Sequence, residues 1–254
     1  MRVYLILVSI LYFCGGCQSR ESDSGATTNE AQAIIDKAIA AHGGKEYEQL
    51  AVVFDFRDRH YTAARLNGKY TYTRSFTDST GQVKDVLTNN GFTRTINGQV
   101  KQLPDERVKA FTSSVNSVIY FALLPFGLND PAVKKELLGT VTIKQKPYYK
   151  IKVGFNQEGG GTDFQDEFLY YIHQKTATMD YLAYTYATEG GGIRFREAIN
   201  PRTVNGILFQ DYINYEPVGT IDFWQIEKLF DAGKLKEFSR IELQNLRVSS
   251  ASAN

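Results

Sequence analysis

Cysteine is scarce in this sequence, and both of its copies lie near the start of the chain. Cys14 and Cys17 form a Cys-x-x-Cys pair in LYFCGGCQSR, and none follows. A redox pair of this spacing would follow a strand and open a helix inside a folded domain, whereas this pair follows an apolar run. The sequence therefore excludes disulfides and thiol chemistry from the function of the chain beyond Cys17.

Histidine and an excess of either charge are scarce as well. His42, His60 and His173 are isolated from one another, so no second ligand pair completes a zinc site with the cysteines. The 29 Lys and Arg balance 28 Asp and Glu, and no basic block occurs. No GxSxG, HExxH, Walker or GxGxxG pattern occurs either. We therefore expect no metal, no cofactor and no nucleic-acid partner.

The first residues follow the plan of a secretory signal peptide. Arg2 gives a positive start, and residues 3–13 form a run that is apolar apart from Ser9. A run of this length is too short to cross a bilayer as a helix. We expect residues 1–16 to be removed, which leaves 28 residues of each charge and a formally neutral mature chain.

Gly15 and Gly16 before Cys17 resemble the cleavage site of bacterial lipoproteins, where the cut falls just before a cysteine that carries diacylglycerol. Cys14 stands where that site usually has leucine, and ordinary secretion with two free thiols is the alternative. The resemblance implies that Cys17 is lipidated by acyl chains such as palmitate. It also implies a membrane anchor in the cell envelope. We expect this anchor in the outer membrane, on either its periplasmic or its surface face.

The next residues lack any apolar period. Residues 18–29 are small and polar, which is typical of a disordered tether. The lipidated N-terminus is therefore expected to cover residues 17–29. Residues 30–254 are enough for one β-rich domain with a sizeable core, which we expect to be a monomer.

Few segments have helical periodicity. Apolar spacing predicts amphipathic helices over residues 29–43 and 104–122, and a short third helix over residues 131–138. Most of the remainder is rich in β-branched and aromatic residues, with Gly, Asn and Asp between the runs. Short connections favour antiparallel neighbours. The predicted fold class is α+β, with a large curved antiparallel β-sheet and a few helices packed on one face.

Several of these segments resemble known families. The first helix ending in AHGG, the long meander, the mid-chain helix and the late FSRIELQNL strand resemble the outer-membrane lipoprotein-sorting superfamily of LolA, LolB and LppX. FRDRHYTA, MDYLAY, GGIRFREA and FQDYINY look like an uncharacterised family of Gram-negative envelope lipoproteins. The superfamily resemblance implies an incomplete β-barrel closed by helices around an apolar cavity for acyl chains.

One predicted strand carries polar residues on its apolar face. If residues 54–60 form a single strand, Phe54, Phe56, Asp58 and His60 share one face. The phenylalanines mark that face as the covered one. Asp58 and His60 are then predicted to lie on the covered face, toward one end of it.

Two later strands repeat this arrangement, and the predicted inward pairs are Phe195 with Glu197 and Phe209 with Asp211. Arg194 and Arg196 are predicted to point away from the covered face. An acid on an apolar face needs a partner. Either it belongs to a ligand cavity with apolar walls, or it reaches solvent at a strand end or pairs with Arg or Lys.

These faces predict an envelope lipoprotein that binds or carries a hydrophobic, acylated ligand between sheet and helices. The candidate ligand-binding residues are Phe54, Phe56, Asp58, His60, Phe195, Glu197, Phe209 and Asp211. One alternative is a structural or assembly lipoprotein without a pocket. Another is an envelope enzyme in which Asp58 and His60 form an acid/base pair, although their spacing along a strand is about 6.6 Å.

Overall fold

The computed structural model describes residues 24–158, 164–187 and 190–251. The expected signal peptide, Cys17 and the first part of the expected tether lie outside the described residues. None of the helices in the described part of the chain is long and apolar enough to cross a membrane.

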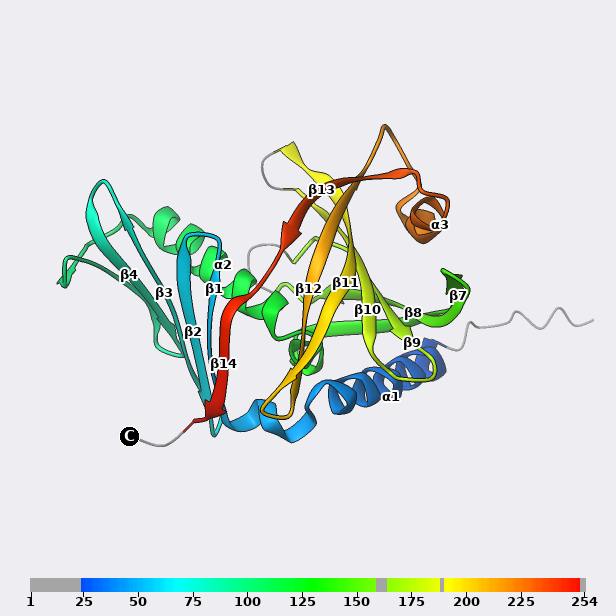
Figure 1. Ribbon diagram of the computed structural model, residues 1–254, viewed down its shortest axis with the longest axis horizontal. Helices are drawn as coiled ribbons and strands as arrows, with labels where there is room; N and C mark the ends of the chain where they lie inside the picture. The colour runs from blue at the N-terminus through cyan, green and yellow to red at the C-terminus, as the bar shows by residue number, and fades with distance from the viewer. Residues whose placement is uncertain (1–23, 159–163, 188–189, 252–254) are drawn as a thin grey trace, which may run out of the picture.

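The described residues form two seven-stranded antiparallel sheets with helices against them (Figure 1). Sheet A has the strand order β14-β1-β2-β3-β4-β5-β6, and sheet B has the order β13-β12-β11-β10-β9-β8-β7. The strands of sheet A are β1 (Leu50–Phe56), β2 (Arg59–Leu66), β3 (Lys69–Asp78), β4 (Gly81–Thr88), β5 (Gly91–Ile96), β6 (Gln99–Val100) and β14 (Gln244–Ser250). The strands of sheet B are β7 (Val133–Ile143), β8 (Lys146–Phe155), β9 (Phe168–His173), β10 (Met179–Tyr186), β11 (Gly192–Val204), β12 (Ile207–Pro217) and β13 (Leu235–Ile241).

The helices stand before, between and after groups of strands. The α-helices are α1 (Ser24–His42), α2 (Asp105–Ala122) and α3 (Ile226–Asp231), and the 3-10 helices are η1 (Gly44–Gln49), η2 (Phe126–Asn129) and η4 (Phe223–Gln225). The bounds of α2 confirm the predicted helix over residues 104–122. The predicted helix over residues 131–138 is wrong, because β7 begins at Val133 and its side chains alternate in exposure along the strand.

Three Asn-Gly pairs close hairpins in the two sheets. Asn67–Gly68 joins β2 to β3, Asn97–Gly98 joins β5 to β6, and Asn205–Gly206 joins β11 to β12. All six residues have positive φ. This backbone matches the twist of the flanking strands, and Asn and Gly adopt it most readily.

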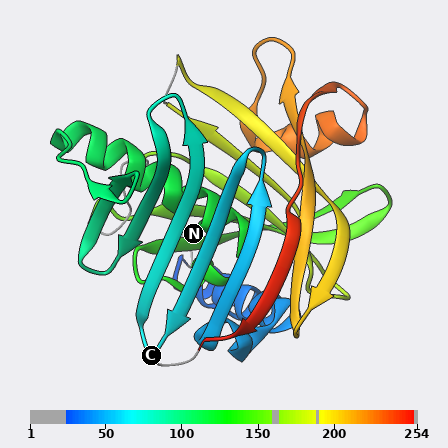
Figure 2. The same cartoon turned by 60° about the vertical axis from the view of Figure 1, so that its left-hand side comes forward.

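The last two strands connect the sheets. β13 pairs with β12 and β14 pairs with β1, so the chain passes from sheet B to sheet A between Ile241 and Gln244. The sheets follow each other around a bend at this point (Figures 1 and 2). β6 and β7 stand at the two far ends of the strand order, so the described strands do not form a closed ring. The predicted α+β class with a curved antiparallel sheet is confirmed, with the sheet divided in two.

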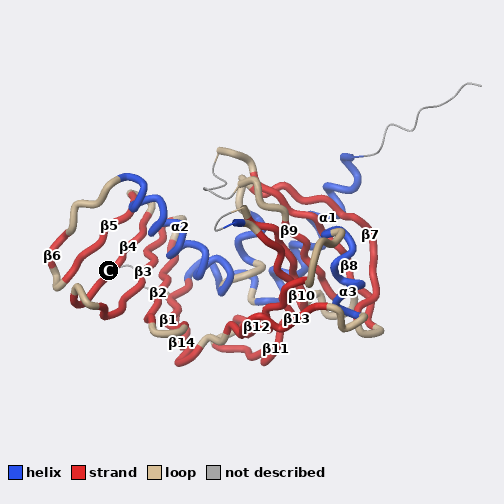
Figure 3. The backbone as a smooth tube through the Cα atoms, turned by 90° about the horizontal axis from the view of Figure 1, so that it is seen from above, coloured by secondary structure: helices blue, strands red, loops and turns tan. Residues whose placement is uncertain are grey.

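Helix α2 packs on the side of sheet A that faces sheet B (Figure 3). Val115 and Ile119 are fully buried against aromatic and aliphatic side chains of the sheet. Beneath the helix, Arg74 Nη2 lies 2.6 Å from Asp85 Oδ2, and Arg74 Nη1 donates to Ser114 Oγ at 2.6 Å. These contacts fix α2 along one wall of the space between the sheets.

Sheet B is covered on both faces. Ala31, Ile35 and Ala38 of α1 are fully buried on the inner face, which looks toward α2. Helix α3 covers the outer face, where Phe230 stacks on Phe195 with 4.5 Å between ring centres. The sequence did not predict α3, which adds a helix to the second face of sheet B.

Helix α1 begins earlier than the sequence predicted. It starts at Ser24, so residues 24–29 are helical and not part of a disordered tether. The predicted end near Gly43 is confirmed, because the helix ends at His42 and Gly43 has a positive φ of 144°.

Candidate ligand-binding groove

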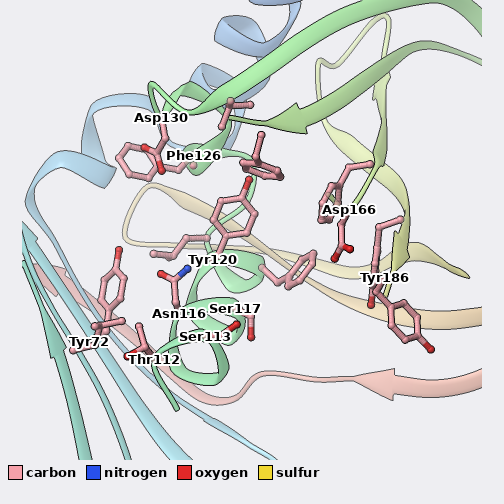
Figure 4. A pocket seen from close by; sticks show the side chains of 18 of the residues that line it. Tyr72, Thr112, Ser113, Asn116, Ser117, Tyr120, Phe126, Asp130, Asp166 and Tyr186 are labelled. Atoms are coloured by element: carbon pink, nitrogen blue, oxygen red, sulfur yellow. The ribbon is translucent and has the colours of Figure 1, made fainter. Parts of the chain in front are cut away.

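A groove of about 1250 Å³ lies between α2 and the two sheets. Figure 4 shows it from close by, with Thr112 and Asn116 of α2 on the side of Tyr72 in sheet A. Asp166 and Tyr186 line it on the far side of the helix (Figure 4). The groove therefore runs past α2 from one sheet to the other.

Aromatic rings form the wall on the side of sheet B. Phe121 of α2 lies 5.6 Å from Tyr184, and Phe168 lies 5.6 Å from both Tyr184 and Phe155, between ring centres. All four rings line the groove. Such a row of rings offers a continuous apolar surface to a ligand.

A second cavity of about 270 Å³ lies between α2 and β12. It shares with the groove the lining residues Phe56, Ser117, Phe121, Tyr184, Arg196 and Ile241. Val118 and Ala122 of α2 and Leu243 of the crossing between the sheets also line it. The groove therefore has an inner extension beneath α2.

Arg196 lines both the groove and its extension. Its side chain is buried, and Nη2 donates to the Tyr184 hydroxyl at 2.8 Å. The guanidinium carbon lies 4.2 Å from the centre of the Phe121 ring and 5.0 Å from that of Tyr184. Its Nε is buried and has no hydrogen-bond partner within residues 24–158, 164–187 and 190–251. Because a guanidinium does not release its proton in proteins, this site holds a fixed positive charge.

The charges around the groove are mainly positive. The charged residues that line it are Arg57, Arg65, Lys109, Arg194, Arg196, Asp130 and Asp166. Burial raises the pKa of Tyr72, although Arg65 beside it opposes this, and burial also raises the pKa of Tyr120, so neither of these hydroxyls adds a negative charge. The groove is therefore apolar along its rings and cationic in its charged side chains.

Asp58 and His60 do not lie on the covered face. Arg57, with a φ of 56°, and Asp58 form a turn between β1 and β2, so the predicted single strand over residues 54–60 is wrong. The Asp58 side chain is 78% exposed. His60 Nδ1 lies 2.6 Å from Asp55 Oδ1, and the two residues are direct partners across the hairpin. The acid/base pair of Asp58 and His60 therefore does not form.

Strand β11 presents the opposite face to the groove from the one predicted. Arg194 and Arg196 line the groove. Phe195 is buried against α3, and Glu197 on the same face pairs with Lys144 and accepts a hydrogen bond from the Tyr215 hydroxyl at 3.1 Å. Both faces of this part of sheet B are covered, so an apolar residue does not mark the face of the groove.

The remaining candidate residues have structural surroundings. Asp211 is buried, and its Oδ1 accepts from Arg202 Nη2 at 2.9 Å and from the backbone N–H of Leu243 at 3.0 Å. Phe54 and Phe209 lie in the core between sheet A and β12. Of the eight candidate residues, only Phe56 lines the groove. Within the described residues, no cluster of three His, Cys, Asp or Glu side chains could hold a metal ion.

Comparison with solved structures finds distant similarity along most of the chain. A LolA superfamily protein from Nitrosomonas europaea is 11% identical, with 88% of this chain and 94% of that chain covered and a TM-score of 0.49. A putative outer-membrane lipoprotein-sorting protein domain from Vibrio parahaemolyticus is 6% identical, with 91% and 95% covered and a TM-score of 0.40. The lipoprotein LppX from Mycobacterium tuberculosis is 12% identical, with 64% and 90% covered and a TM-score of 0.29.

These are the protein groups that the sequence resembles. Identities and TM-scores this low say nothing about a ligand. No curated protein matches the sequence. A family model matches residues 2–243. The chain belongs to the family described as DUF6503, a family of unknown function.

Proposed function

We propose that this protein is an envelope lipoprotein that binds or carries a hydrophobic, acylated ligand in the groove between α2 and the two sheets. The observation that carries this proposal is the row of rings from Phe121 to Phe155 along a groove of about 1250 Å³. The ligand class is the one that the resemblance to lipoprotein carriers implied.

The gain in free energy comes from the chain of the ligand. Each CH2 group that leaves water contributes about 0.8 kcal/mol, so ten groups against the rings contribute about 8 kcal/mol before the costs of association. A charge in contact with the chain would cancel part of this gain. The aromatic wall supplies the apolar contact that such a chain requires.

The expected anchor keeps the groove close to a membrane. Helix α1 begins at Ser24, and the chain from a lipidated Cys17 to this residue reaches at most about 25 Å. A ligand with acyl chains would therefore meet the groove near the bilayer that supplies or receives it.

Native mass spectrometry of the full chain, purified from its own membranes, tests the proposal. We expect a second species whose added mass is that of an acyl compound, and the same compound in an organic extract of the protein. A protein without added mass, whose extract holds no acyl compound, would favour the assembly lipoprotein.

A further inference from the structure

We propose that the ligand is an acyl compound that ends in an anion, a carboxylate or a phosphate, and that Arg196 binds this anion at the inner end of the groove. This inference rests on the proposed function and names the chemical class of its ligand. It also assigns a role to a residue that the sequence pattern placed on the wrong face.

The first argument is that Arg196 differs from the other buried cations. Arg74 and Lys150 are buried, and each pairs with a buried acid, Asp85 and Glu227 respectively. Arg196 is only 8% exposed, yet among the described residues no carboxylate lies within 4.0 Å of its nitrogens. Burial of a charge is costly unless an opposite charge or hydrogen bonds compensate it.

The second argument is the geometry of the guanidinium. The rings of Phe121 and Tyr184 lie against the guanidinium, and the Tyr184 hydroxyl accepts a hydrogen bond from one of its N–H groups. Arg196 lines the groove, and its Nε–H has no acceptor among the residues that the structure describes. A carboxylate or phosphate oxygen is the acceptor that arginine binds most strongly.

The third argument is that a second buried polar side chain, Asn214, lies beside Arg196. Asn214 is the direct cross-strand partner of Arg196 and also lines the groove. Its Oδ1 is buried and has no partner in the described part of the chain, while Nδ2 donates to Ser239 Oγ at 3.3 Å. Rotation of the amide by 180° lets Oδ1 accept from the Ser239 hydroxyl and Nδ2 donate to the ligand anion.

These positions orient the ligand. Arg196 stands where the groove meets its inner extension, so the anion lies at the inner end and the acyl chain runs outward. The chain then follows the rings of Tyr184, Phe168 and Phe155. Five cations and two acids among the described lining residues favour entry of an anion over a cation.

Calorimetric titration of the full chain with three ligands of equal chain length tests this. The ligands are a hexadecanoic acid, its neutral methyl ester and a hexadecyl phosphate. The variants are Arg196→Gln and a control, Arg240→Gln, which removes the same charge from an exposed side chain outside the groove. One hydrogen bond to a charged group corresponds to about a 10- to 100-fold change in affinity.

We expect the wild type to bind an anionic ligand at least about tenfold more tightly than the ester. Arg196→Gln should abolish this preference, and a circular dichroism spectrum that matches that of the wild type should show that the variant folds. Arg240→Gln should change neither affinity. The stronger of the two anions identifies the headgroup as carboxylate or phosphate.

Equal wild-type affinity for ester and anions would overturn the inference and leave the proposed function intact. So would an anion affinity that Arg196→Gln does not change. If Arg196→Gln binds no ligand at all, the wild-type preference for an anion, and its decline with added salt, decides the question. Absence of binding of all three ligands to the wild type would contradict the proposed function itself.

Discussion

His42, the last residue of α1, accepts a hydrogen bond through Nε2 from the backbone N–H of Met179 at the start of β10, at 3.0 Å. This bond joins the end of the helix to sheet B in a fully buried place. Burial lowers the pKa of His42 to about 4, with opposition from Leu208 and Asp180. The imidazole is therefore neutral in the folded protein at neutral pH, as its role as an acceptor requires.

This pKa predicts a loss of stability in mild acid. Between pH 6.5 and pH 4 the unfolded chain binds a proton at His42 that the folded protein does not bind. The contribution of the neutral His42 imidazole to the free energy of unfolding is fully present above pH 6.5. It declines by about 3 kcal/mol as the pH falls to 4. Urea unfolding of the wild type and of His42→Gln across this range measures it. If the free energy of unfolding of His42→Gln declines with falling pH as steeply as that of the wild type, His42 is not the cause of the decline.

The buried pair of Lys150 and Glu227 is predicted to couple α3 to sheet B. Lys150 Nζ lies 2.9 Å from Glu227 Oε2, which also accepts from the Tyr171 hydroxyl at 2.9 Å. Lys150→Met should lower the free energy of unfolding by about 3 to 5 kcal/mol, because it leaves a buried carboxylate without its cation. Lys150→Met combined with Glu227→Leu should lower it by much less than the sum of the single changes.

The exposed pair of Arg240 and Glu237 provides the control for that comparison. Its two charges lie 2.8 Å apart on side chains that are about half exposed. Arg240→Met should change the free energy of unfolding by less than about 1 kcal/mol. If Lys150→Met changes it no more than Arg240→Met does, the buried pair does not hold α3 in place.

The membrane anchor is tested by the two cysteines. If Cys17 is lipidated, Cys17→Ala should move the protein from the detergent phase to the aqueous phase in a phase-separation experiment. Cys14→Ala should leave it in the detergent phase. The opposite pattern would assign the lipid to Cys14.

The elements with one covered face could be predicted from the sequence. The apolar stripe of α2, with Val115 and Ile119 at its centre, gave the correct bounds because the other side of the helix carries polar side chains such as Thr112 and Asn116. Residues 131–138 were misassigned because Lys, Glu and Leu there are good helix formers, whereas pairing with β8 makes them an edge strand. Tertiary contacts override local propensity at such a place.

The residues of sheet B that line the groove could not be predicted, because both faces of this sheet are covered. In β11 the alternation of Phe195 with Arg194 and Arg196 is regular, but the phenylalanine packs under α3 and the arginines face the groove. Periodicity distinguishes two faces and does not say which one holds a ligand. The turn at Arg57 and Asp58 was missed for a different reason, since it lacks the Asn-Gly signal that marks three of the other hairpins.

The most direct test of the proposed function is to fill the groove with a bulky side chain and to titrate the variant with a fluorescent fatty-acid probe. Ser117 of α2 lines both the groove and its extension, whereas Ala110 of the same helix is exposed and lines neither. We predict that Ser117→Trp weakens probe binding by tenfold or more and that Ala110→Trp leaves it unchanged. Equal binding by both variants, or no binding of the probe to the wild type, would contradict the claim that this groove holds an acyl ligand.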